Sequence, residues 1–142
     1  MMRITGWIVA GVWVVSPCMS QDAREPAFRT EGERAFILGQ MRLFLQSTQA
    51  ITVALGKGDL KTVEGEAAAR GRKGTPASSI PPGMKAKETP AWGAMMGGAR
   101  AGFDDLAKAA HEGAPPTELI GMLGETMGNC VACHQNYRLA PE

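Results

Sequence analysis

The sequence predicts an all-α fold, an antiparallel up-down-up-down four-helix bundle. Apolar residues recur at steps of three and four in four separate stretches of the 142-residue chain, which is the spacing of one helix face. Glycine and proline separate these stretches, and most of the connections are short, as in antiparallel bundles. The expected four-helix domain covers residues 31–142 and follows a flexible segment, 21–30, and a signal peptide, 1–20.

The first 20 residues have the order of a cleaved secretory signal peptide. The basic start Met1-Met2-Arg3 precedes an apolar run over 4–15, and small and polar residues follow over 16–20. The run is too short to span a bilayer comfortably, which favours cleavage, so the mature chain is expected in the periplasm with no membrane span. One alternative is that the segment stays uncleaved as a membrane anchor. The other is lipid attachment at Cys18, although Pro17 is a poor fit to the small residues that precede a lipidated cysteine.

The charge of the mature chain is balanced. Removing residues 1–20 removes Arg3 and no acid, which leaves 14 basic and 14 acidic residues. Nucleic-acid binding calls for a basic excess or stripe, so no nucleic-acid partner is expected. A protein partner must therefore recognise local patches.

The first helix is predicted from residue 31 to about residue 55. Thr30 and Glu33 have the spacing of a capping box, and glycines at 56 and 58 end the helix. Leu38 and Leu45 are expected to widen its apolar face. That face consists of Ile37, Met41, Phe44, Thr48, Ile51 and Leu55.

A short second helix is predicted from a cap at Asp59 to about Arg70. Its inward residues are expected to be Leu60, Val63 and Ala67. Glycines and prolines over 71–89 exclude a continuous helix, so this stretch is predicted to be a loop. Long loops are often functional or mobile, but a passive crossover is the favoured interpretation.

Thr89-Pro90 predicts the start of a third helix that reaches His111. Its apolar stripe is Trp92, Met96, Ala99, Phe103, Leu106 and Ala110. Its four glycines cost about 1 kcal/mol each relative to alanine, so something bulky is expected to pack against them. Thr117 is the expected cap of the fourth helix. The inward face of that helix is expected to hold Ile120, Leu123, Met127, Cys130, His134 and Tyr137.

The motif Cys130-Val131-Ala132-Cys133-His134 has the spacing of c-type haem attachment. One helical turn brings both sulfurs to the same side, where they can form thioethers with the two haem vinyl groups. The next residue, His134, can then ligate the iron as the proximal ligand. The sequence predicts one covalent haem c. A disulfide or a thiol redox site is the alternative for a lone cysteine pair, but the adjacent histidine favours haem.

Helix geometry predicts where the haem lies. His134 is about 30 Å along the fourth helix from the turn near Ala114, at ~1.5 Å per residue. The same depth falls near residue 94 on the third helix and near residue 37 on the first. The haem is therefore expected between the helices at the end where the first and third begin. His111, the other histidine, lies about 25 Å from that level and is expected to be exposed at a helix C-terminus.

Met41 is the candidate distal ligand, because it lies on the inward stripe within about one turn of the expected haem level. A thioether suits iron, and methionine opposite histidine raises the reduction potential. The alternative is that Met41 only fills space. Met95 and Met96 lie at a similar depth and are expected to pack on the porphyrin. Without a methionine ligand, the iron would be five-coordinate and open to a small gas.

Other side chains are expected around the pocket. The predicted apolar walls are Trp92, Phe103 and Tyr137. A guanidinium can form two parallel hydrogen bonds with a carboxylate, so one arginine near the pocket can pair with a haem propionate. The alternative for each arginine is that it is solvated at the surface. The candidates are Arg42, Arg100 and Arg138.

Together these stretches resemble class II c-type cytochromes, the cytochrome c′ family. The haem motif followed by Asn136-Tyr137-Arg138 is similar to that family's C-terminal signature. The stretch Gly102-Phe103-Asp104-Asp105-Leu106-Ala107 resembles a third-helix stretch of many small members. Met41-Arg42, Ala54-Leu55 and Gly58-Asp59 resemble the first two helices. The resemblance covers about residues 31–139.

The resemblance implies a choice between two kinds of haem site. Low-spin members use a methionine from the first helix, at the position that Met41 matches, whereas high-spin members are five-coordinate. Many small relatives have a histidine where this chain has Arg100, so a role tied to that histidine does not transfer. Family members often form homodimers through the first two helices, which makes a homodimer an expected form.

The expected function is electron transport in the periplasm, with single electrons carried through the covalent haem to and from a redox partner protein. The alternative is a five-coordinate haem module that binds NO or CO. A third class is an enzyme, such as a peroxidase or a thiol oxidoreductase. No catalytic acid or base lies near the motif by spacing, so the chain is not expected to be an enzyme.

Overall fold

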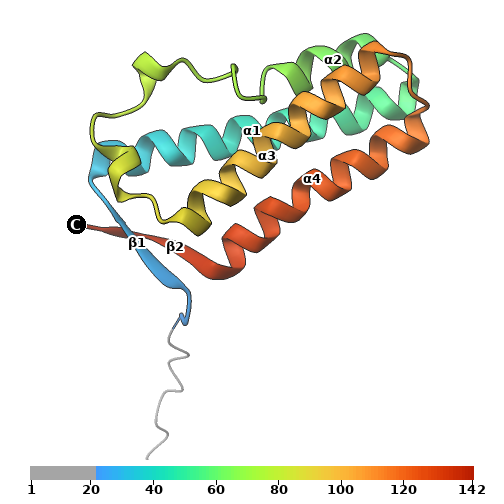
Figure 1. Cartoon of the computed structure of the whole chain (residues 1–142). Helices are drawn as coiled ribbons and strands as arrows, with labels where there is room; N and C mark the ends of the chain where they lie inside the picture. The colour runs from blue at the N-terminus through green and yellow to red at the C-terminus, as the bar shows by residue number, and fades with distance from the viewer. Residues whose placement is uncertain (1–21) are drawn as a thin grey trace, which may run out of the picture.

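The chain folds into four helices and a small two-stranded sheet (Figure 1). The computed structural model describes residues 22–142, so the predicted signal peptide, 1–20, lies outside the described residues. The prediction of a mainly helical fold with four helices is confirmed, whereas the sheet was not predicted. Within residues 22–142, no helix is long and apolar enough to cross a membrane.

Helix α1 (Glu31–Lys57) begins at the predicted residue and ends two residues after the predicted Leu55. The Thr30 hydroxyl accepts a hydrogen bond from the Glu33 amide at 3.3 Å, and the Glu33 carboxylate accepts one from the Thr30 amide at 2.9 Å. Gly58 caps the other end with φ of +69°, a conformation that glycine adopts without strain. Leu38 and Leu45 are exposed instead of widening the buried face, since each lies one residue (about 100°) round the helix from a buried side chain.

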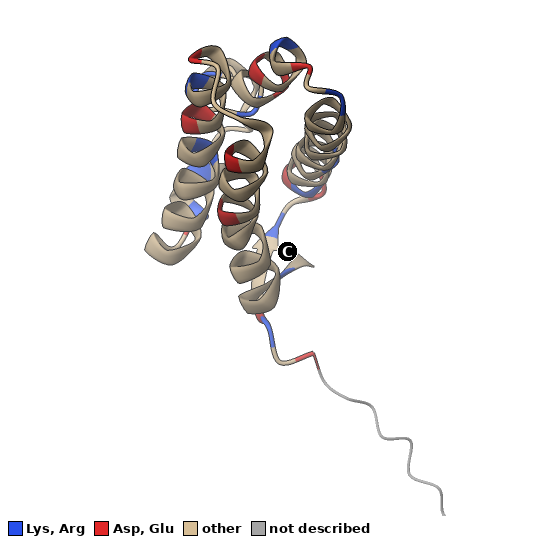
Figure 2. Cartoon of the chain, turned by 90° about the vertical axis from the view of Figure 1, so that its right-hand side faces the viewer, with Lys and Arg blue, Asp and Glu red and all other residues tan. Residues whose placement is uncertain are grey.

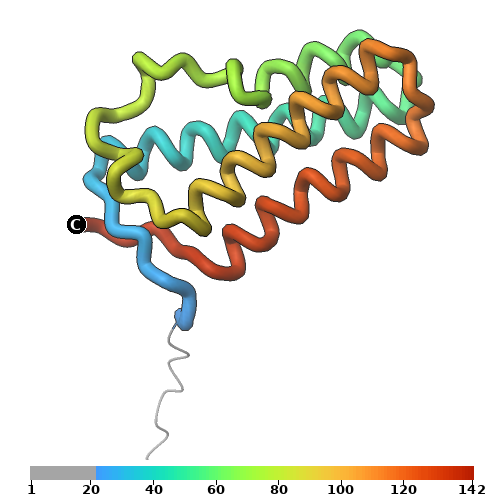
Figure 3. Tube along the Cα trace, viewed as in Figure 1, coloured from blue at the N-terminus to red at the C-terminus, as the bar shows by residue number. Residues whose placement is uncertain are grey.

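Helix α2 (Leu60–Ala68) starts at Asp59, whose carboxylate accepts a hydrogen bond from the Thr62 amide at 3.1 Å. The connection that follows contains two short 3₁₀ helices, η1 (Ala77–Ser79) and η2 (Met84–Lys87). It runs beside the first half of α1 to the end of the molecule where α3 begins (Figure 3). Its residue Met84 is buried against Ile37 and Trp92, so the crossover covers part of the core.

Helix α3 (Pro90–His111) starts as predicted, with the Thr89 hydroxyl accepting a hydrogen bond from the Trp92 amide at 3.1 Å. Helix α4 (Pro116–Asn136) does not use Thr117 as its cap, because Pro115 takes that position without a side-chain hydrogen bond. The prediction of that cap was wrong.

The buried face of α4 is rotated from the predicted one. Leu119, Leu123 and Thr126 are buried. Ile120, Met127 and His134, which were predicted on the inward face, are exposed. Because Thr126 is polar, the spacing of apolar residues in the sequence did not reveal this face. Its hydroxyl donates to the Met122 carbonyl at 2.8 Å and is thereby satisfied inside the protein.

Two glycines of α3 allow α4 to approach closely. A Cβ atom at Gly98 would lie 2.6 Å from Asn129 Oδ1, and one at Gly102 would overlap the Thr126 side chain. The expectation that something packs against the glycines of this helix is thus met at these two positions. Gly93 and Gly97 face open space.

The sheet joins the two ends of the described chain. Strands β1 (Glu25–Arg29) and β2 (Tyr137–Pro141) pair in parallel, with Glu25 opposite Tyr137 and Arg29 opposite Pro141. The segment 21–30, which was expected to be flexible, therefore contains a strand. Tyr137, which was expected on the fourth helix, has extended backbone and begins β2.

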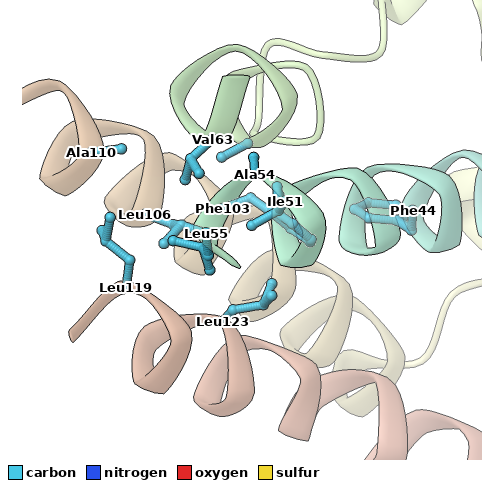
Figure 4. Close-up of a cluster of buried hydrophobic side chains, with 11 residues drawn as sticks. Phe44, Ile51, Ala54, Leu55, Val63, Phe103, Leu106, Ala110, Leu119 and Leu123 are labelled. Atoms are coloured by element: carbon cyan, nitrogen blue, oxygen red, sulfur yellow. The ribbon is translucent and has the colours of Figure 1, made fainter. Parts of the chain in front are cut away.

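The buried side chains form two clusters. The larger one fills the space between the helices and includes Phe44, Ile51, Phe103, Leu106 and Leu123 (Figure 4). The smaller one contains Ile37, Met84 and Trp92 and lies beside the sheet. The turns between α1 and α2 and between α3 and α4 lie together at the opposite end from the sheet (Figure 1).

Candidate functional site

A cavity of about 480 Å³ lies where α1 and α3 begin and α4 ends. Side chains from α1, α3, α4, β2 and the segment before β1 line it. Its walls include Ile37 on α1 and Met95 on α3, next to the levels that helix geometry predicts for the haem. The predicted depth on both helices therefore coincides with a real cavity.

All four predicted haem ligands line this cavity. Cys130, Cys133 and His134 lie on the last two turns of α4, and Met41 lies on α1. Met95 and Met96 of α3 also line it. The structure thus places two cysteines one helical turn apart, the His134 imidazole and the thioethers of three methionines around one cavity.

His111 is where the sequence places it, away from this cavity. It is the last residue of α3, its side chain is 73% exposed, and its Nδ1 lies 3.1 Å from Glu64 Oε1. It does not line the cavity. The two histidines of the chain therefore do not share a site.

The two cysteines are free and half-buried. Burial raises the pKa of the Cys130 thiol. Burial also raises the pKa of Cys133, and the neighbouring Cys130 adds to that effect. Cysteines that act as redox nucleophiles have lowered pKa values in electropositive surroundings, so these surroundings do not activate a thiolate.

The residues present fit a covalently attached haem. Cofactor sites have volumes of about 300–1,000 Å³, and this cavity falls within that range. Two cysteines one turn apart beside a histidine supply two thioether positions and a nitrogen ligand. Arg138 also lines the cavity, and its buried Nε has no hydrogen-bond partner, so a propionate carboxylate would satisfy it.

Of the three aromatic residues that were predicted as pocket walls, two line the cavity and one does not. Trp92 and Tyr137 line the cavity and contact each other edge to face, with ring centroids 5.3 Å apart. Phe103 was predicted as a wall but packs in the larger core cluster, 5.5 Å from the Phe44 ring. Its place in the apolar stripe of α3 could not reveal this, since that stripe passes from one cluster to the other.

The three candidate arginines lie in different places. Arg138 lines this cavity, and Arg100 lines a smaller neighbouring one. Arg42 is exposed and contributes to neither.

Two charged residues of the site were missed by sequence reasoning. Asp22 and Arg24 line the cavity, and Arg24 Nη1 donates to the His134 carbonyl at 3.2 Å. The hydrogen bonds from Arg24 lower the pKa of Asp22 to about 2. No pattern in the sequence marks these residues, because their position depends on the unpredicted strand that follows them.

The helical turns around the cavity carry few charges. Residues 90–99 of α3 and 126–136 at the end of α4 contain no Asp, Glu, Lys or Arg. Figure 2 shows the corresponding long uncharged stretches of helix. Within residues 22–142, no cluster of three His, Cys, Asp or Glu side chains could hold a bare metal ion.

Comparisons of this chain with models of protein families, with curated proteins and with solved structures find no match.

Proposed function

We propose that this chain is an exported c-type cytochrome of the cytochrome c′ type that carries single electrons. One observation carries the proposal: Cys130, Cys133 and His134 of α4 and Met41 of α1 line the same cavity. Cys130 and Cys133 would hold the haem through thioethers, and His134 would be the proximal ligand. The bound haem c supplies one-electron exchange between ferric and ferrous iron.

The protein residues fix and shield the site. α4 presents both cysteines and His134 from consecutive turns, so their relative positions are set by one rigid element. Arg138 offers an unpartnered buried donor to a carboxylate. The uncharged turns of α3 and α4 keep the surroundings at low polarity.

We also propose that the helices pack as an antiparallel up-down-up-down bundle around the haem. The turns of both helix pairs lie at one end, and the candidate site lies at the other (Figure 1). Cofactors of helix bundles are held between facing helices in this way. Such a bundle would limit the structural change that accompanies a change of oxidation state.

Met41 is the proposed distal ligand. It is partly buried in the wall of the cavity and comes from the helix that packs across from the haem motif. Methionine and histidine together raise the reduction potential and suit electron transfer. The role of carrier, with no substrate turned over, follows from this ligation.

A second candidate function is the binding of NO or CO at five-coordinate iron. It is favoured by one observation: Met41 also borders a second cavity of about 200 Å³, which gives its side chain room to move away from the first. An absorption spectrum separates the two candidates. A low-spin spectrum with a methionine–iron charge-transfer band supports the carrier, and a high-spin spectrum supports the gas-binding module.

The location and partners are part of the proposal. Export to the periplasm, with cleavage near residue 20, would bring the chain to the compartment in which a periplasmic redox partner works. A homodimer through α1 and α2 is compatible with the exposed side chains of Leu45 and Val53 on α1.

The experiment is production of the full chain in a bacterial host that exports proteins and attaches haem c. The purified protein should have the mass of the processed chain plus one haem, with haem retained after acid extraction. The double variant Cys130→Ala/Cys133→Ala, produced in the same way, should lose the covalent haem. A native protein without covalent haem, from a host that matures a control cytochrome, would contradict the proposal.

A further inference from the structure

A second cavity, of about 200 Å³, lies between α1, α3 and the crossover that contains η1 and η2. It shares walls with the larger cavity at Ile37, Met41, Trp92 and Met96. The proposed haem site does not use it. Its polar lining is mainly basic, with Arg29, Lys85 and Arg100 against one acid, Glu88.

Arg29 is a buried cation without an anionic partner. Its relative exposure is 3%, and no carboxylate of the described chain forms an ion pair with it. Nη1 and Nη2 donate to the carbonyls of Phe28 and Lys87 at 2.7 Å and 3.3 Å, and the guanidinium lies 5.4 Å from the Trp92 ring centroid. The buried Nε has no hydrogen-bond partner. A buried charge is costly unless it is paired, so this group favours an anion beside it.

The opposite end of the cavity is also positive. Arg100 lies on α3 two turns beyond Trp92, about 12 Å along the helix axis. Its Nη2 donates to Thr75 Oγ1 at 3.1 Å, and Thr75 donates to Gln40 Oε1 at 2.9 Å. Burial lowers the pKa of Arg100, and the like charge of Arg70 lowers it further. No carboxylate in the described residues forms an ion pair with Arg100, so this end of the cavity also has a positive charge without a paired anion.

The space between the two arginines is apolar. Its walls are made by Phe36, Ile37, Met41, Met84, Trp92 and Met96. An inorganic oxyanion would satisfy the arginines but would gain nothing from these walls. A carboxylate with a hydrocarbon body matches both features.

We infer that this cavity binds a small monocarboxylate with a short hydrocarbon body, whose carboxylate group lies against Arg29. The free Nε and the remaining N–H groups of the guanidinium form a fork that suits a carboxylate. The hydrocarbon body extends along the methionine and aromatic walls. The inference goes beyond the proposed electron transfer and does not depend on the ligation of the iron.

The test is isothermal titration calorimetry of the purified holoprotein with acetate, propionate and butyrate, each as the sodium salt. Each added methylene should tighten binding about fourfold, because a buried methylene contributes about 0.8 kcal/mol. Sodium nitrate supplies an inorganic oxyanion without a hydrocarbon body and should bind more weakly than butyrate. Equal binding of nitrate and butyrate, or no binding of any carboxylate, would overturn the inference.

Variants locate the bound carboxylate. Arg29→Gln should weaken butyrate binding at least tenfold, whereas Arg42→Gln, which removes the same charge from the surface of α1, should leave it unchanged. Unchanged binding in folded Arg29→Gln protein would refute the assignment of the carboxylate to Arg29. Because Arg29 is buried on Trp92, folding of the variant is checked by circular dichroism.

A second pair of variants tests the cavity even if Arg29→Gln does not fold. Gly97 lines the cavity and has open space at its Cβ position, so Gly97→Leu can fill the cavity without a backbone clash. Gly93 also has open space but does not line the cavity. Gly97→Leu should abolish butyrate binding and Gly93→Leu should preserve it. Binding that survives in Gly97→Leu would place the carboxylate elsewhere.

Discussion

Arg24 Nη1 donates a hydrogen bond of 3.2 Å to the backbone carbonyl of His134, a residue 110 positions later in the chain. That carbonyl belongs to the last turn of α4, where carbonyl groups have no partner within the helix. The same guanidinium pairs with Asp22 at 2.7 Å. The segment before β1 thus secures the backbone of the proposed proximal ligand.

Replacing Arg24 should loosen the end of α4. In Arg24→Ala, the carbonyl of His134 loses its donor, so amide hydrogen exchange in the last turn of α4 should become several-fold faster. Exchange in the middle of α3 should not change. Arg42→Ala, which removes an exposed arginine from α1, is the matched control, and equal exchange rates in the two variants would exclude the proposed role of Arg24.

Replacing Met41 tests the distal ligand. Met41→Ala should remove the methionine–iron charge-transfer band and convert the ferric spectrum to high spin, because the other two methionines of the cavity, Met95 and Met96, lie on α3 and not on α1. Met127→Ala removes an exposed methionine of α4 outside the cavity and should leave the spectrum unchanged. An unaltered spectrum in Met41→Ala would show that this residue does not ligate iron.

Gly102→Ala should destabilise the protein by about 1–3 kcal/mol, because the added methyl group would overlap the Thr126 side chain and force α3 and α4 apart. Gly124→Ala on α4 has open space and should stabilise by about 0.5–1 kcal/mol. Urea denaturation followed by circular dichroism measures both. A stabilised Gly102→Ala would mean that the helices are not in close contact there.

The stability of the protein should depend on the charge of Glu33. Hydrogen bonds from Lys87, at 2.8 Å, and from the Thr30 amide lower the pKa of this carboxyl group. Its usual value in an unfolded chain is about 4.3, so the unfolded state binds the proton more readily. The stabilisation from the charged form is therefore complete above pH ~4.3 and is lost as the pH falls through the lower folded-state pKa.

The measurement compares thermal midpoints of the native protein and Glu33→Gln from pH 7 to pH 3. The native protein should be the more stable at neutral pH, and the difference should shrink in acid. Glu125→Gln, at an exposed position of α4, should differ little from the native protein throughout. A Glu33→Gln difference that is the same at both ends of the range would show that the charge of Glu33 does not stabilise the fold.

The sequence predicted the helices well because their signals are local. The Thr30–Glu33 capping box, the left-handed Gly58 and the Thr89-Pro90 start depend on residues a few positions apart, and the structure has all three. The depth at which the cavity lies could also be predicted, since the rise of a helix is constant. Met41 and the haem motif therefore meet the same cavity in the structure.

The features that sequence reasoning missed depend on contacts between distant segments. β1 and β2 show no alternation of apolar and polar residues, and each is a strand only because the other lies beside it. The buried face of α4 was predicted wrongly because it includes a polar residue, Thr126. Its hydroxyl can be buried because it donates a hydrogen bond to the Met122 carbonyl of the same helix. The second cavity could not be predicted, because the crossover that covers it has no periodic pattern.

The parallel pairing of β1 with β2 also has a kinetic consequence. The first and last elements of the described chain must meet to form it, and closing so long a loop is entropically unfavourable until the intervening helices have packed. The sheet should therefore be among the last parts of the protein to fold. Until it forms, the end of α4 that bears Cys130, Cys133 and His134 stays accessible, which would give an attachment enzyme time to act before the chain closes.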